Sequence, residues 1–188
     1  MKNLIIIIAI TFGSISCKAQ QEYSINTVPS NIPNGSYIKD INNELDIFVG
    51  TYKALYNNKE FVININKVVK KNFILSGLNY YKDALVVKYT IKDLSGNILQ
   101  STINNANESK HFITNTIVLS QKNEVRFYYT GGDCGIGWGS IRIKKLNNNE
   151  ISWSYYPNNT TLDNINCPNP IDTKVYLPET ENLIFTKQ

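Results

Sequence analysis

Residues 125–156 read VRFYYTGGDCGIGWGSIRIKKLNNNEISWSYY, and this stretch decides the fold of the chain. Three segments within it, 125–130, 141–144 and 151–156, alternate between apolar and polar residues. Alternation is the period of β-strands that bury one face. The turn before the third segment is Asn147-Asn148-Asn149, and asparagine tolerates the left-handed backbone that a tight hairpin needs. The sequence therefore predicts a β-meander.

The loop between the first two of these strands, GGDCGIGWG at residues 131–139, is rich in glycine. Glycine at alternate positions leaves one face bare, so another backbone, an aromatic ring or a ligand can approach closely. One interpretation is a bent strand entry that neighbouring side chains cover. The other is a phosphate cradle, which we disfavour because the spacing is neither G-x-G-x-x-G nor a P-loop and a strand follows.

Similar patterns outside the central stretch predict more strands. Alternating or apolar segments lie at residues 51–56, 61–69, 85–92, 98–103, 116–119, 174–177 and 182–186. A single open sheet of so many short antiparallel strands would leave long unpaired edges. We therefore expect a mainly β protein, an up-and-down antiparallel meander closed into a lipocalin-like barrel or a rolled sheet.

Composition limits the number of domains and the kind of partner. The 188 residues are 42% hydrophobic, which suffices for the core of one domain and hardly for two. The formal net charge is +4, and the lysines are scattered along strand faces. We therefore expect no nucleic-acid partner. Because the sequence has no paired histidines and no zinc spacing, we also expect no metal or other cofactor.

Residues 1–19 have the features of a secretory signal peptide. A short positive start precedes an apolar run at residues 4–12, which is too short to span a membrane as a helix. Two cleavage outcomes are open. Ser16 before Cys17 resembles a relaxed lipobox and predicts a lipidated Cys17, with the lipid as the only membrane anchor. Cleavage after Ala19 would instead yield a soluble periplasmic or secreted protein.

The chain after the signal peptide is expected to begin as a tether. Prolines and Asn34-Gly35 interrupt any periodicity in residues 20–36, so the single domain is assigned to residues 37–188. One short N-terminal helix is expected at its start, with Asp40 as N-cap and Gly50 at the C′ position. The apolar face of that helix would consist of Ile41, Leu45, Phe48 and Val49.

Two resemblances add to these inferences. The path from Asp40 into Gly50-Thr51-Tyr52 resembles the entry of lipocalin-type and fatty-acid-binding barrels, in which Gly-x-Trp opens the first strand. Tyr52 replaces the tryptophan here. The resemblance implies a barrel that can hold a small apolar ligand.

The second resemblance covers nearly all of the mature chain and is to a family of short secreted Gram-negative proteins of unknown function. It is carried by NNELDIFVGTYK (42–53), NYYKDALVVKYTI (79–91), residues 131–140, ISWSYYP (151–157) and YLPETENLIFTKQ (176–188). This resemblance implies an envelope location and provides no catalytic residues.

Cysteine and histidine usage bears on redox state and catalysis. Cys134 and Cys167 remain as an even pair beside Cys17, and an oxidising periplasm would favour a disulfide between them. Two free buried thiols are the alternative.

His111 is the only histidine, and no triad or zinc spacing appears. An enzyme would need a polar cluster around His111 or Asp133 that the sequence does not display, so we expect no catalysis.

Two functional hypotheses follow from the aromatic residues. The first is a non-catalytic envelope protein that binds a small apolar or amphipathic ligand in its barrel. Its candidate ligand contacts are Tyr129, Trp138, Trp153 and Tyr155. The second is a protein-interaction module of the envelope that uses the glycine-rich loop or an exposed aromatic face at Tyr128 and Tyr156.

Overall fold

The computed structural model describes residues 20–188 apart from positions 107, 109, 164, 166 and 169–171. The signal peptide expected at residues 1–19, with Cys17, lies outside this described part. Strands account for 51% of the described residues and helices for 7%, which confirms the mainly β class.

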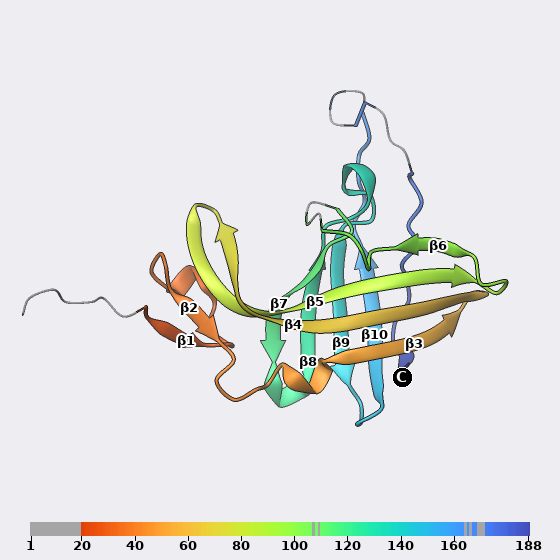
Figure 1. The fold of residues 1–188 in the computed structure, drawn as a ribbon. Helices are drawn as coiled ribbons and strands as arrows, with labels where there is room; N and C mark the ends of the chain where they lie inside the picture. Colours follow the sequence, from red (N-terminus) through yellow and green to blue (C-terminus); the bar gives the residue numbers. More distant parts are fainter. Residues whose placement is uncertain (1–19, 107, 109, 164, 166, 169–171) are drawn as a thin grey trace, which may run out of the picture.

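Eight antiparallel strands form a closed up-and-down barrel (Figure 1). Strands that follow one another in the chain are neighbours in the sheet, and the last strand pairs with the first. The barrel strands are β3 (Gly50–Tyr56), β4 (Lys59–Leu75), β5 (Leu78–Asp93), β7 (Ile113–Leu119), β8 (Glu124–Tyr129), β9 (Gly139–Lys145), β10 (Glu150–Pro157) and β11 (Leu183–Lys187). The predicted barrel is therefore confirmed, with β8, β9 and β10 as its central meander. Residues 174–177 form no strand.

The seam between β5 and β7 is one of the two shortest pairings of the barrel, together with that between β3 and β11. Only Val86↔Thr114 and Val87↔Ile113 are in register there. The short strand β6 (Ile98–Ser101) pairs with β5 further along and takes no part in closure. Side chains extend the seam, because Leu85 N donates to Asn115 Oδ1 at 2.7 Å. The chain therefore pairs with β5 through β6, leaves it in the loop that follows, and pairs with β5 again only through the short contact with β7.

Large aromatic side chains fill the barrel interior. Tyr129, Trp153 and Tyr155 point inward, and none is more than 3% exposed. The Tyr129 and Tyr155 rings meet edge to face with centroids 6.0 Å apart, and Trp153 lies 5.8 Å from Phe185. Such ring pairs add to the free energy of area burial. The alternation in the central meander is confirmed.

The expected tether is packed against the barrel. Residues 20–36 contain β1 (Glu22–Ser24) and the 3-10 turn η2 (Pro29–Asn31), and β1 pairs in parallel with β2 (Tyr37–Lys39). β2 in turn pairs with β5, where the long β4–β5 ribbon extends past the barrel (Figure 1). Prolines do interrupt the periodicity, but Ile25 and Ile32 are buried and hold the segment in place.

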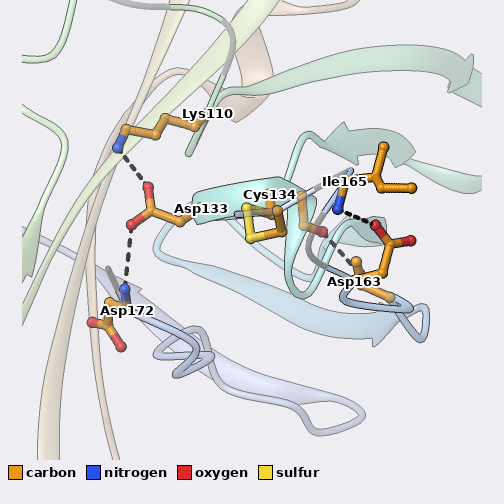
Figure 2. Close-up of a disulfide and its surroundings, with 9 residues drawn as sticks. Lys110, Asp133, Cys134, Asp163, Ile165 and Asp172 are labelled. Atoms are coloured by element: carbon orange, nitrogen blue, oxygen red, sulfur yellow. Dashed lines mark hydrogen bonds and ion pairs between the residues drawn. A yellow bond between two sulfur atoms is a disulfide. The ribbon is translucent and has the colours of Figure 1, made fainter. Parts of the chain in front are cut away.

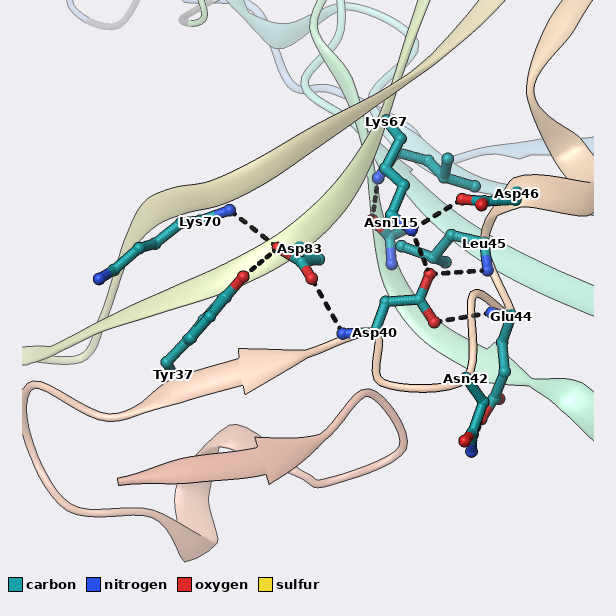
Figure 3. A network of polar contacts seen from close by, with 11 residues as sticks. Tyr37, Asp40, Asn42, Glu44, Leu45, Asp46, Lys67, Lys70, Asp83 and Asn115 are labelled. Carbon is teal, nitrogen blue, oxygen red and sulfur yellow. Dashed lines mark hydrogen bonds and ion pairs between the residues drawn. The ribbon is translucent and has the colours of Figure 1, made fainter. Parts of the chain in front are cut away.

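The predicted N-terminal helix is wrong. Residues 40–49 form turns and the single 3-10 turn η3 (Asp46–Phe48). Asp40 does act as a cap, since its carboxylate accepts hydrogen bonds from Glu44 N at 2.7 Å and Leu45 N at 3.1 Å (Figure 3). Asn43 has a left-handed φ of 56°, which no right-handed helix tolerates.

Two further 3-10 turns, η4 (Ser120–Lys122) and η5 (Asp133–Gly135), flank β8. Across the described part of the chain, no helix has the length and apolar character needed to cross a bilayer.

Candidate ligand-binding site beside His111

The glycine-rich loop packs against the rest of the protein at one end of the barrel. A Cβ on Gly131 would overlap the Gly135 backbone, and one on Gly139 would overlap the Tyr156 carbonyl oxygen. Gly137 lies under the Tyr155 side chain, whose hydroxyl donates to the Gly137 carbonyl. The glycines thus permit the close backbone and ring approach expected from the sequence, in a bent strand entry that side chains cover.

A disulfide joins this loop to residues far along the chain. Cys134 and Cys167 are bridged with their Cα atoms 5.7 Å apart, as expected from the sequence (Figure 2). Next to the bridge, Lys110 Nζ lies 2.6 Å from the Asp133 carboxylate, which also accepts a hydrogen bond from Asp172 N at 3.3 Å (Figure 2). The hydrogen bond from Lys110 is the main reason why the pKa of Asp133 is below its ordinary value. Three separate segments are therefore held together beside the barrel end.

His111 lies in the loop between β6 and β7, directly against the glycine-rich loop. Its backbone N donates to Gly131 O at 2.6 Å, and its own φ is a left-handed 56°. A Cβ on Gly132 would lie 3.0 Å from His111 Cε1, so the imidazole ring covers a position that only glycine leaves open. Unusual backbone at a non-glycine residue persists only where the surroundings hold it, and such residues cluster at functional sites.

The imidazole begins a chain of polar side chains that enters the barrel. His111 Nδ1 lies 2.9 Å from the Tyr129 hydroxyl, which lies 3.5 Å from the Tyr89 hydroxyl. Tyr89 in turn donates to Gln100 Oε1 at 2.8 Å. His111 is thus part of a polar cluster, and the sequence did not display this cluster.

This cluster is uncharged at neutral pH. Burial, and then the nearby Lys110 ammonium, lower the pKa of His111 below its ordinary value. Burial raises the pKa of Tyr129 to about 12 and also raises that of Tyr89. Within the described part of the chain, the hydrogen bonds of the imidazole are made through Nδ1, so Nε2 is the ring nitrogen that can meet a ligand. Neutral imidazole offers one donor and one acceptor, so the group can orient a polar ligand without an ionic bond.

A cavity of about 250 Å³ lies beside His111, over the β5–β7 seam. It exists because the loop from β6 leaves β5 after Ser101 pairs with Thr90, and the chain returns to β5 where Ile113 pairs with Val87. Its lining residues are Val68, Lys71, Val86, Val87, Lys88, Thr102, Asn105, Ala106, Glu108, His111 and Phe112.

One wall of this cavity is organised by Lys71. Its ammonium lies 2.5 Å from the Glu108 carboxylate and 5.3 Å from the centroid of the Phe112 ring. An ammonium over an aromatic face is attracted by the ring quadrupole. Lys71 therefore holds the aromatic wall and the acidic residue of the loop in fixed positions.

The residues predicted from the sequence as ligand contacts are separated by the structure. Tyr129 and Tyr155 lie together below His111, whereas Trp153 packs in the core and donates Nε1 to Pro178 O at 3.3 Å. Trp138 lies on the outside of the barrel and is 37% exposed. Ligand contact by these four residues stays a prediction.

Sequence reasoning missed the residues that surround His111. Tyr89 was recognisable only as one inward residue of an alternating strand, and Lys71 and Phe112 had no distinguishing signal. Their proximity depends on how the seam closes. In the described residues, no group of three or more His, Cys, Asp or Glu side chains is placed to hold a metal ion.

Comparison with known proteins gives a family and no named function. No curated protein and no solved structure matches this chain. A family model described as "Family of unknown function (DUF6705)" matches residues 1–188. The closed barrel is consistent with the resemblance to lipocalin-type barrels. By its sequence over the whole length, the chain belongs to DUF6705, a family of unknown function.

Proposed function

We propose that this protein is a non-catalytic binding protein of the cell envelope that takes a small amphipathic ligand in the cavity beside His111. The observation that carries this proposal is the cavity itself, in which apolar side chains and a held imidazole face the same space. Ligand pockets typically combine an apolar lining with a few precisely placed polar groups.

The barrel interior is a poorer location for a ligand. Trp153 and Phe185 are completely buried, and Tyr129 is in contact with both His111 and Tyr155. Protein interiors are close-packed, so a ligand there would have to displace these rings. The seam cavity needs no such displacement.

The lining suggests the chemistry of the ligand. Val87 and Phe112 offer apolar surface, and His111 offers hydrogen bonding, whereas the Thr102 hydroxyl is bound to the backbone of Tyr89. Lys71 and Lys88 contribute two positive charges against the single negative charge of Glu108, which leaves a balance of 2 − 1 = +1. A molecule with an apolar body and a polar or anionic head fits these surroundings.

The envelope location is supported by two independent features. The disulfide between Cys134 and Cys167 is of a kind that persists in oxidising compartments. The first 19 residues have the pattern of an export signal.

Native mass spectrometry of the protein purified from its own envelope tests the proposal. We expect a reproducible extra mass under gentle conditions that disappears on denaturation. Val68→Trp should abolish this extra mass by filling the cavity, whereas Val69→Trp should preserve it, because Val69 is 66% exposed and does not line the cavity. A bare wild-type chain, or an extra mass that survives Val68→Trp, would contradict the proposal.

A further inference from the structure

Three aromatic rings and an arginine surround a serine on the outer face of the central meander. Strand register places Tyr128 beside Ser140 and Ser140 beside Tyr156. Trp138 and Arg142 lie two residues before and after Ser140, the spacing of one strand face. Trp138 and Tyr128 have ring centroids 6.3 Å apart. Tyr128, Trp138 and Tyr156 are 42%, 37% and 39% exposed, so the rings face solvent. We call these five residues the aromatic platform.

In the described part of the chain, no carboxylate forms an ion pair with Arg142, so the platform carries a positive charge. Arg142 is the direct cross-strand partner of Arg126, and both side chains lie on the outer face. Like charges directly opposite each other destabilise a sheet. Arg126 is paired with Glu124 at 3.3 Å, whereas Arg142 donates to the uncharged Tyr156 hydroxyl at 3.1 Å. A bound anion at Arg142 would offset this repulsion, and guanidinium binds carboxylate in a bidentate fashion.

The surface is suited to a ring-shaped ligand. Tyr128 and Tyr156 are two strand spacings apart, which is roughly 10 Å, with the small Ser140 hydroxyl between them. Exposed aromatic rings can pack on the C–H face of a ligand ring. The hydroxyls of Ser140 and Tyr128 can form hydrogen bonds with it, and that of Tyr156, which accepts from Arg142, can still donate.

A peptide lacks its usual mode of docking at this place. Strands β8, β9 and β10 are each paired on both sides, so no strand edge is exposed for a peptide to extend.

We infer that the aromatic platform binds an acidic saccharide, with the sugar ring packed between Tyr128 and Tyr156 and its carboxylate at Arg142. This surface is separate from the His111 cavity, since none of its residues lines that cavity. The inference therefore stands or falls independently of the proposed function.

Calorimetric titration with oligouronates tests this inference. The probes are tri-α-galacturonate and tri-β-mannuronate, with maltotriose as the neutral trimer and triglutamate as the acidic peptide. We expect at least one oligouronate to bind wild-type protein at least tenfold more tightly than either comparison compound. Arg142→Gln should weaken that binding at least tenfold, and so should the double variant Tyr128→Ser/Tyr156→Ser. Lys122→Gln, an exposed charge on η4 beyond the other end of β8, should leave it unchanged.

Four outcomes would overturn the inference. They are no binding of either oligouronate, equal affinity for maltotriose, equal affinity for triglutamate, and unchanged affinity in both platform variants. Equal affinity for triglutamate would reassign the surface to acidic peptides. Because Arg142 and both tyrosines are on the surface, neither variant should unfold below the wild-type urea midpoint, and Arg142→Gln should unfold at or slightly above it because the repulsion from Arg126 is lost. An undiminished midpoint shows that lost binding is local.

Discussion

Two polar clusters in this molecule differ in how completely their hydrogen bonds are satisfied. Asp83, where the N-terminal segment meets the β4–β5 ribbon, is 4% exposed and accepts three hydrogen bonds (Figure 3). They come from Tyr37 Oη at 2.6 Å, Asp40 N at 2.9 Å and Lys70 N at 2.9 Å. His111 at the barrel end is only partly buried, binds through Nδ1 and adjoins a cavity.

The difference separates a structural cluster from a candidate binding site. All donors to Asp83 come from the chain itself, so its charge is used to hold β2 and the Asp40 turn in place. Among the described residues, His111 forms its side-chain hydrogen bonds through Nδ1 and adjoins a cavity, and its left-handed backbone is held by the surrounding loop. A buried polar group is therefore more informative about function when its surroundings leave part of it unused.

The largest expected effect is at the structural cluster. Asp83→Ala should destabilise the protein by about 3–5 kcal/mol, because two buried donors and one partly buried donor lose their acceptor. Urea unfolding measures this difference. Glu22→Ala is the matched control, since its ion pair with Lys39 is exposed and contributes at most about 1 kcal/mol. Equal effects in the two variants would contradict a structural role for the hydrogen bonds of Asp83.

Loss of the disulfide should have the next largest effect and should act at the His111 end. The Cys134→Ser/Cys167→Ser variant is expected to lose about 3–4 kcal/mol, given a sequence separation of 33 residues. Reductant should bring wild-type protein to the same urea midpoint and leave the variant unchanged. Hydrogen exchange should increase in the glycine-rich loop while the Asp83 region stays protected; an increase at Asp83 would show that the two regions are coupled.

Lys82, the neighbour of Asp83, provides a test by pH. It is buried, it donates to Thr116 O at 3.0 Å, and burial lowers its pKa to about 8. Between about pH 8 and pH 9.5 the unfolded chain, with an ordinary lysine pKa near 10.4, binds more protons than the folded protein. The free energy of unfolding should therefore rise with pH across this window. Lys82→Met should remove the rise, and an unchanged slope would show that Lys82 is not its source.

The smallest effect should come from His111 in acid. Because its pKa is lowered in the folded state, the unfolded chain takes up the proton first, and stability should fall as pH drops below about 6.5. NMR titration observes this group directly, since His111 is the only histidine. His111→Asn, which suits the left-handed backbone, should abolish the loss down to about pH 5. A measured pKa at or above 6.5 would contradict the burial of the ring.

Local sequence patterns predicted some features well and others only in part. The alternation in β8, β9 and β10 predicted which residues face inward, because side-chain direction in a strand depends only on position. The Asp40 prediction was half right. Its carboxylate does accept the backbone N–H groups that a cap accepts, but the same carboxylate also binds Lys67 from β4 at 2.7 Å, and Asn43 ends the turn.

The sequence by itself determined the eight strands of the barrel, the inward faces of its central meander, the need for closure and the pair of cysteines, because these depend on local periodicity and composition. It missed β1 and β2 and predicted a strand at residues 174–177 that does not form. The tertiary structure alone decided that His111 meets Tyr129 and Tyr89, that a cavity opens over the β5–β7 seam, and that residues 20–36 pack on the ribbon. Those features depend on the register in which distant strands pair. Register is set by the packing of the whole barrel, and a single segment does not encode it.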